Sequence, residues 1–216
     1  AFRKLAGPAQ LQIMYGLAGE RRLPEIEIPW LPGYESSTPV RVGNAAHDQL
    51  QLDVYGEVMD AMHQARRGGL VESEADWAFQ SAVLRHLESI WQRPDHGLWE
   101  VRGEPRHFTY SKVMAWVAFD RGIHAIEQFN LSGPIDRWRQ IRQAIHDEVC
   151  ERGFDRELGS FVQSYGSKEL DASLLLLSTV GFLPPDDPRI RGTIEAVERR
   201  LFSDGFLLRY DTRTTD

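Results

Sequence analysis

The stretch Asp95-His96-Gly97-Leu98-Trp99 decides the fold, because two later stretches of the chain repeat its pattern. Residues 155–161 and 203–207 also place an aspartate before a glycine and continue into a short apolar run. Each of the three stretches follows a pair of segments with helical periodicity. Antiparallel helices joined in this way bring the exit of every pair to the same end. The repeat therefore predicts three helical hairpins whose loops share one rim.

Six segments carry the helical pattern. They begin near Ala45, Ser73, Phe108, Pro134, Leu170 and Pro188. The first ends near Gly68 and presents an apolar face made of Leu50, Val54, Val58 and Met62, with Tyr55 and Ala61 filling it. Ser73 and Asp76 resemble a capping box at the start of the second. In the fifth, Leu174-Leu175-Leu176-Leu177 is apolar on all sides, which predicts a helix that is buried all round.

The first forty residues have a different pattern. Residues 11–16 and 23–28 alternate apolar and polar side chains, and residues 19–22 connect them. This predicts a short β-hairpin. The expected fold class is therefore mainly α, with a β-hairpin and loop over residues 1–43 and helical hairpins over residues 44–216. We expect a single, incomplete domain.

Composition excludes several classes of function. The 216 residues carry a net charge of -7 with the basic residues scattered, which argues against a nucleic-acid partner. No apolar run is long enough for a membrane span, and Ala1-Phe2-Arg3-Lys4-Leu5 is not the start of a secretory signal. Cys150 is the only cysteine, which favours a reducing cytoplasm. The seven histidines are too far apart to predict a metal site, and no phosphate-binding glycine loop occurs, so no cofactor is expected.

The loop after the second helix offers an acid next to an aromatic ring. Glu100 follows Trp99 directly, and a glutamate held against an indole is partly desolvated, which raises its pKa. A glutamic acid that stays protonated can give its proton to a leaving oxygen, as the general acid of a glycosidase does. The structural alternative is that Trp99 covers a core and Glu100 is a solvated loop acid. The predicted rim also gathers other aromatic and polar side chains, including Arg102, Tyr110, Tyr165, Arg209 and Tyr210.

Several stretches resemble glycoside hydrolase family 15, the glucoamylase and trehalase family, and they run along nearly the whole chain. They are Gln12 to Gly16, Leu31 to Tyr34, Pro39 to Ala46, Gln49 to Glu57, Trp99-Glu100, Phe108 to Lys112 and Leu170 to Leu175. The resemblance implies part of an (α/α)6 barrel and an inverting cleavage of terminal α-glucosidic bonds. In this chain it implies that Glu100 is the general acid and that Arg209 binds substrate hydroxyls. Trp99, Asn44 and Tyr110 are expected to bind substrate, and Asp171 is expected to be either a structural residue or one that lies outside the residues that touch substrate.

The chain departs from the family in completeness. The family's general base lies in a glutamate-containing loop, and the surroundings of Glu57, Glu104 and Glu169 do not resemble that loop. We therefore expect the base outside this chain and little or no activity from the chain alone. The alternative is a non-catalytic α-helical segment that binds carbohydrate or protein. A helical scaffold for protein partners is disfavoured by the loop aromatics. Which α-glucoside is cleaved, and whether phosphate or magnesium is needed, is left open by the residues.

Overall fold

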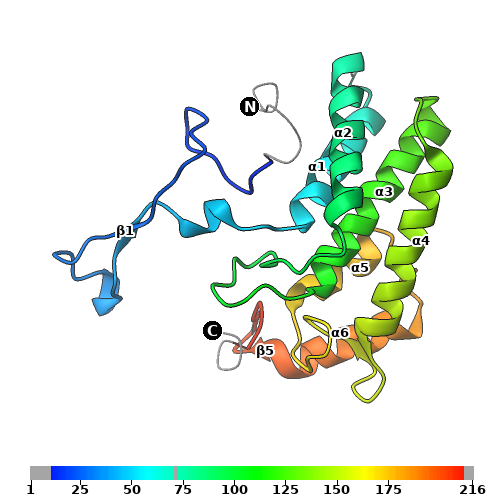
Figure 1. Ribbon diagram of the computed structural model, residues 1–216. Helices are drawn as coiled ribbons and strands as arrows, with labels where there is room; N and C mark the ends of the chain where they lie inside the picture. The colour runs from blue at the N-terminus through cyan, green and yellow to red at the C-terminus, as the bar shows by residue number, and fades with distance from the viewer. Residues whose placement is uncertain (1–10, 71–72, 212–216) are drawn as a thin grey trace. The chain divides into compact units, whose positions relative to one another are not determined.

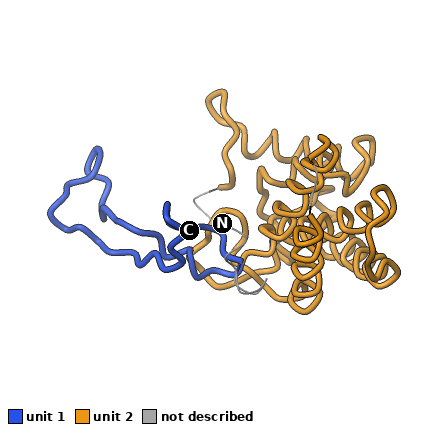
Figure 2. The backbone as a smooth tube through the Cα atoms, turned by 90° about the horizontal axis from the view of Figure 1, so that it is seen from above, with its two compact units in different colours: residues 1–50 blue, residues 51–216 orange. Residues whose placement is uncertain are grey.

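The computed structural model describes residues 11–70 and 73–211. The chain divides into two compact units, residues 1–50 and residues 51–216 (Figure 2). The described part is mainly helical, and small two-stranded sheets accompany its six α-helices. The fold class expected from the sequence is thus confirmed. Among the described residues no helix is both long and apolar enough to cross a membrane.

The first unit contains a two-stranded antiparallel sheet, but its strands are not those expected. Strand β1 (Ile26–Glu27) pairs with β2 (Arg41–Val42), and the 3-10 helices η3 (Tyr34–Ser36) and η4 (Ala45–Asp48) lie between and after them. Residues 11–16 form no strand. The side chain of Gln12 instead donates to the carbonyls of Arg21 and His47, both at 2.9 Å. The expected pairing of residues 11–16 with 23–28 is therefore wrong, because alternation identifies strand-like segments without identifying their partners.

The second unit contains all six α-helices (Figure 1). Their bounds are α1 Asp53–Arg67, α2 Glu74–Ile90, α3 Thr109–Phe129, α4 Ile135–Arg152, α5 Leu176–Thr179 and α6 Pro188–Leu201. The 3-10 helix η5 (Ala172–Leu175) precedes α5. The predicted capping box is present, since Ser73 and Asp76 bond each other's backbone N–H groups at the start of α2. Pro188 is the first residue of α6, as the sequence predicted.

The helix buried on all sides is α3, and not the leucine run. Leu176 is 40% exposed, whereas most residues of α3 are buried, including Lys112. Small residues allow the close packing: a side chain at Gly56 on α1 would lie 2.2 Å from the carbonyl oxygen of Met114, and one at Gly122 would meet Leu84 of α2. The chain thus places α3 at the centre of the second unit, against α1, α2 and α4.

The buried face of α1 also differs from the predicted one. Tyr55, Met59 and His63 are buried, while Val54 and Val58 are only partly so. This face lies one position further along the chain than the predicted stripe. Since Gly56 lies on it, the helix can turn this side toward α3 at close range.

The three repeat loops lie toward one end of α1 to α4, as predicted, but α6 runs across that end, so the third helix pair is not the expected antiparallel hairpin (Figure 1). The second loop contains strands β3 (Phe154–Asp155) and β4 (Ser160–Phe161), and the third contains β5 (Phe202–Ser203) and β6 (Phe206–Leu207). Backbone bridges join the segments that follow the loops, from Phe108 to Ser164 and from Asp171 to Tyr210. We call the region made of residues 91–108, 160–171 and 209–210 the loop end.

Candidate active site

The turn at residues 97–100 fixes the backbone of the Trp99-Glu100 pair. Gly97 has a φ of 69°, and a side chain on it would collide with the ring of Phe108 at 2.9 Å. Glu100 has a φ of 57°, in the left-handed region that non-glycine residues rarely adopt. Its N–H donates to the carbonyl of Gly97 at 3.3 Å, which closes the turn. Strained backbone of this kind clusters at functional sites, although in this chain Glu35 and Asp204 also adopt it.

A buried carboxylate holds the indole of Trp99. The Nε1–H of Trp99 donates to both carboxylate oxygens of Asp171, at 3.0 and 2.9 Å. The same carboxylate accepts from the side chain of Gln163 at 3.1 Å and from the N–H of Ser173 at 2.8 Å. These contacts join residues that are up to 72 positions apart in the chain. The indole is thus fixed by tertiary contacts in addition to its own loop.

Arg209 lies next to the same indole. Its guanidinium carbon is 5.7 Å from the centre of the Trp99 ring, within the range of a cation–π contact. Tyr210 lies beside them, with its ring centre 6.4 Å from that of Trp99. The N–H of Ala172 donates to the carbonyl of Arg209 at 2.8 Å, which anchors this segment beside Asp171. The structure therefore brings together two predicted site residues, Trp99 and Arg209.

Tyr110 lies in the buried layer behind Trp99. Its hydroxyl donates to Glu57 at 2.9 Å, and burial, followed by the negative charge of Glu57, raises the pKa of Tyr110. Trp99, Tyr110 and Asp171 share a cavity of only about 10 Å³. Such a volume has room for about one water molecule and not for a sugar ring. Substrate contact by Tyr110 stays a prediction, and any sugar would have to bind on another side of the indole.

Asn44 belongs to the first unit and has a local role there. Its side chain accepts from the N–H of Ala46 at 2.9 Å and so caps the 3-10 helix η4. Its carbonyl oxygen lies 2.9 Å from the ring nitrogen Nδ1 of His47. The predicted contact between Asn44 and substrate stays a prediction.

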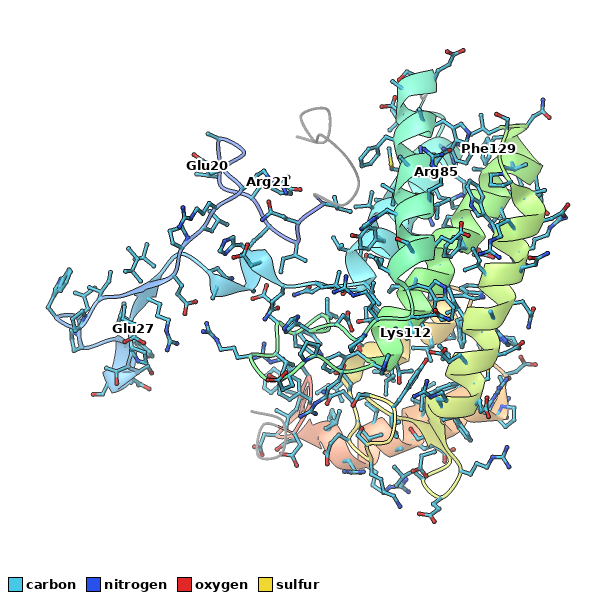
Figure 3. The ribbon with its side chains drawn as sticks, viewed as in Figure 1. Glu20, Arg21, Glu27, Arg85, Lys112 and Phe129 are labelled. Carbon is cyan, nitrogen blue, oxygen red and sulfur yellow. The ribbon has the colours of Figure 1, made fainter. Side chains whose placement is uncertain are left out.

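Buried charged residues fix the start of the loop that carries Glu100, and the sequence reasoning assigned them no role. Lys112, at the base of α3 (Figure 3), donates to the carbonyl of Trp91 and, at 2.7 Å, to that of Arg93. Burial lowers the pKa of Lys112 to about 8. Asp95 accepts from the N–H of Leu52 at 2.9 Å. The polar residues at the start of an otherwise apolar α3 were the pattern that could have revealed this.

A second buried acid, Asp53, lies close enough to Asp95 for the negative charge of Asp95 to affect its pKa. Asp53 opens α1, and burial raises its pKa to about 7, with the negative charge of Asp95 adding to the rise. Burial also raises the pKa of Asp95. Both acids lie at the base of the loop end. Within residues 11–70 and 73–211, no cluster of histidine, cysteine and acidic side chains has the composition of a metal site.

Comparison with known families and proteins agrees with the arrangement. The model of the family "Glycosyl hydrolases family 15" matches residues 3–216. A trehalase of Mycobacterium tuberculosis is 44% identical over 206 residues, which cover 95% of this chain and 30% of that protein. A trehalase of Thermoplasma volcanium is 43% identical over 201 residues, covering 93% of this chain and 32% of that protein. The chain thus spans about three tenths of the length of these curated relatives.

Solved structures resemble the fold at lower sequence identity. A wild-type glycosidase matches with a TM-score of 0.66 and 22% identity, over 84% of this chain and 50% of that one. A variant glycosidase solved in complex with glucose matches equally well, with a TM-score of 0.66 over the same shares. The helices and small hairpins described above therefore correspond to half of a solved glycosidase.

Proposed function

Since the chain belongs to glycosyl hydrolases family 15, we propose that it carries the general-acid half of an inverting α-glucosidase site, with Glu100 as the acid. The carboxyl group of Glu100 gives its proton to the glycosidic oxygen as the bond to the sugar breaks. A second carboxylate activates a water molecule on the opposite face of the ring. We place that base outside this chain, because the surroundings of Glu57, Glu104 and Glu169 do not resemble the family's base loop.

The observation that carries the proposal is the Trp99-Glu100 turn with Arg209 beside the same indole. An indole offers an apolar face to a pyranose ring, and a guanidinium donates hydrogen bonds to hydroxyls. The left-handed backbone at Glu100 gives its side chain a direction that an ordinary loop conformation would not. Together these groups supply an acid, a platform and a hydroxyl-binding cation.

We propose α,α-trehalose as the preferred substrate class, because the curated relatives are trehalases. Trehalose and maltose both present a terminal α-glucosyl group, and they differ in the sugar that leaves. The glucosyl group would lie against Trp99 and Arg209 in either case. A cytoplasmic location stays part of the proposal, on the ground of the single cysteine.

The test places this chain in a complete enzyme. A segment that makes up 31% of the Mycolicibacterium smegmatis trehalase is 44% identical to this chain. Replacing that segment with the matching residues of this chain gives a chimera. The chimera is expected to hydrolyse trehalose. Glu100→Gln should lower its kcat by about 10²–10⁴-fold, the usual contribution of general acid–base catalysis. Glu104→Gln, in the same loop and exposed, is the matched control and should leave kcat nearly unchanged.

A substrate that needs no protonation separates the acid from other roles. Fluoride leaves without a proton from a general acid, so Glu100→Gln should cleave α-glucosyl fluoride far better than it cleaves trehalose. Equal losses on both substrates would contradict the assignment of Glu100 as the acid. Sugar binding without any turnover by the unsubstituted chimera would favour the alternative, a non-catalytic carbohydrate-binding segment.

A further inference from the structure

We propose that Asp171 is a positioning residue that fixes Trp99 and Arg209 together, and through Trp99 directs Glu100. The proposal rests on the proposed function of Glu100 for its catalytic consequence. Its structural part, the coupling of three segments of the loop end by one carboxylate, does not depend on that function. Asp171 is 3% exposed and lies too deep to meet a substrate, so its effect would pass through its neighbours.

The contacts of Asp171 come from three parts of the chain. Trp99 donates from the first repeat loop to both oxygens, and Gln163 donates from the segment after β4. The backbone of residue 171 bridges Tyr210, in the segment after β6, and its neighbour Ala172 bonds Arg209. Each of the three repeat loops, or the segment that directly follows it, therefore meets at this one residue.

The chemistry of the cluster requires a carboxylate. An ionised carboxylate only accepts hydrogen bonds, and here it receives three different donors: an indole N–H, an amide NH₂ and a backbone N–H. An asparagine would replace one acceptor oxygen with an NH₂ group. That group would face the N–H of Trp99 or the NH₂ of Gln163, donor against donor. The indole would then keep only its 3.0 Å bond to the oxygen that also accepts from Ser173, and would lose its second acceptor, although the size of residue 171 is unchanged.

The position of the anchor explains how it would act on Glu100. Residues 99 and 100 are adjacent, and the backbone of Glu100 is in a left-handed conformation that the loop alone would not favour. When the indole is fixed, the Cα of Trp99 can move less, and the chain restrains the neighbouring Glu100 in turn. A displacement of about 1 Å in a reacting group can lower the rate by about 10²-fold.

A matched control separates positioning from simple capping. Asp171 also caps η5 through the N–H of Ser173, so a loss of stability alone would prove nothing. Asp187 caps α6 in the same way, accepting from the N–H of Arg189 at 2.8 Å, and its carboxylate also pairs with the guanidinium of Arg189. Asparagine is a good helix cap, so Asp171→Asn and Asp187→Asn should both keep their caps. Only Asp171→Asn should disturb the indole.

The first measurement uses the 216-residue chain itself and requires no activity. The chain has six tryptophans, and the indole N–H signal of Trp99 in a ¹⁵N–¹H spectrum is identified by its absence in Trp99→Phe. In Asp171→Asn this signal should move and exchange with solvent faster, while Asp187→Asn leaves it in place. An unchanged Trp99 signal in a folded Asp171→Asn variant would overturn the proposal.

The second measurement uses the chimera and the two substrates. Asp171→Asn should lower kcat on trehalose by about 10²-fold and affect α-glucosyl fluoride much less, because only trehalose needs a well-placed acid. Equal losses on both substrates would overturn positioning of the acid. If Glu100→Gln itself leaves activity intact, the proposed function fails, while the spectrum of the chain still decides whether Asp171 anchors Trp99.

A substitution at Trp99, the hydrogen-bond partner of Asp171, tests whether the loss of activity comes only from a folding defect at residue 171. Trp99→Phe keeps an aromatic ring but makes it smaller, and it removes the N–H donor. Its loss on trehalose should be at least as large as that of Asp171→Asn, because Trp99 also lies against the sugar, and the double variant should lose little more than Trp99→Phe alone. Fully additive losses would show that the two residues act separately, and would overturn the proposal.

Discussion

The two ends of the helices in the second unit carry the same pair of side chains with different surroundings. At the loop end, Arg209 lies 5.7 Å from the ring centre of Trp99. At the far end, which we define as Arg66, residues 73–77 and residues 129–132, Arg66 lies 5.8 Å from the ring centre of Trp77. The indole of Trp99 donates to the Asp171 carboxylate, whereas that of Trp77 donates to the carbonyl of Ser132 at 2.9 Å.

The larger cavity lies at the far end, and not at the loop end that carries the candidate active-site residues. The far end has a cavity of about 580 Å³, lined in part by Arg66, Trp77 and Phe129. The cavity behind Trp99 is only about 10 Å³. An aromatic ring with a cation and a large cavity are therefore insufficient to identify the site. What distinguishes the loop end is an acid in a strained turn and a buried carboxylate that fixes the neighbouring ring.

The largest expected effect concerns catalysis by the loop end alone. The isolated 216-residue chain should show no measurable turnover of trehalose, maltose or malto-oligosaccharides, because an inverting reaction needs a second carboxylate to activate water. Glucose release measured against the chimera tests this. Turnover by the isolated chain that Glu100→Gln abolishes would show that the chain contains its own base.

The next effect concerns the buried lysine under the loop end. Lys112→Met removes the donor to the carbonyls of Trp91 and Arg93, and should lower the free energy of unfolding by about 2–4 kcal/mol. The free energy of unfolding is measured by urea unfolding, and an unchanged m-value shows that only stability has changed. Lys112→Arg keeps a charge and donors but is larger, and serves as the comparison. A loss below about 0.5 kcal/mol for Lys112→Met, the scale of a surface change, would contradict an anchoring role.

An effect of similar size depends on pH and involves Asp53. Its pKa is raised to about 7 from 3.8, so the folded state binds a proton that the unfolded state has already released in this range. The stability that this group contributes is therefore complete below about pH 4 and is lost as the pH rises toward 7. The slope should approach 1.4 kcal/mol per pH unit, and Asp53→Asn should remove it. The measurement is the urea unfolding midpoint of the unsubstituted chain and of Asp53→Asn at several pH values between about 4 and 7. If stability fell with pH equally steeply in both proteins, the prediction would be contradicted.

The smallest effect belongs to the far end. Ser73→Ala removes one half of the capping box of α2 and should cost about 1 kcal/mol of stability. The indole signal of Trp99 should not change, because the contacts of that ring lie at the loop end. Movement of the Trp99 signal in Ser73→Ala would show that the two ends are coupled, and the contrast between them would no longer hold.

Much of the fold could be predicted because it depends on local patterns. Periodicity and capping residues located all six helices, and the capping box at Ser73 is present as expected. The first helix begins at Asp53 and not near Ala45, and the fifth is only Leu176–Thr179, preceded by a 3-10 helix. The common rim followed from the repeated Asp and Gly turns. The strand partners of the first unit and the buried face of α1 could not be predicted, because they depend on which surfaces meet. A strand pairs wherever its neighbours allow, and α1 turns toward α3 at the position where Gly56 permits close approach.

For the candidate site, the residue types came from the sequence and their partners from the fold. Trp99, Glu100 and Arg209 were named from the chain, but nothing local linked Trp99 to Asp171, 72 positions away. The sequence assigned no role to Lys112 or Asp53, because a charged residue is expected to face solvent unless the structure shows that it is buried. The sequence by itself determined the helices, the turns and the acid, since these follow from short-range periodicity and backbone preference. Only the tertiary structure decided which buried groups hold Trp99, the neighbour of Glu100, because hydrogen bonds between distant segments form only when packing excludes water from them.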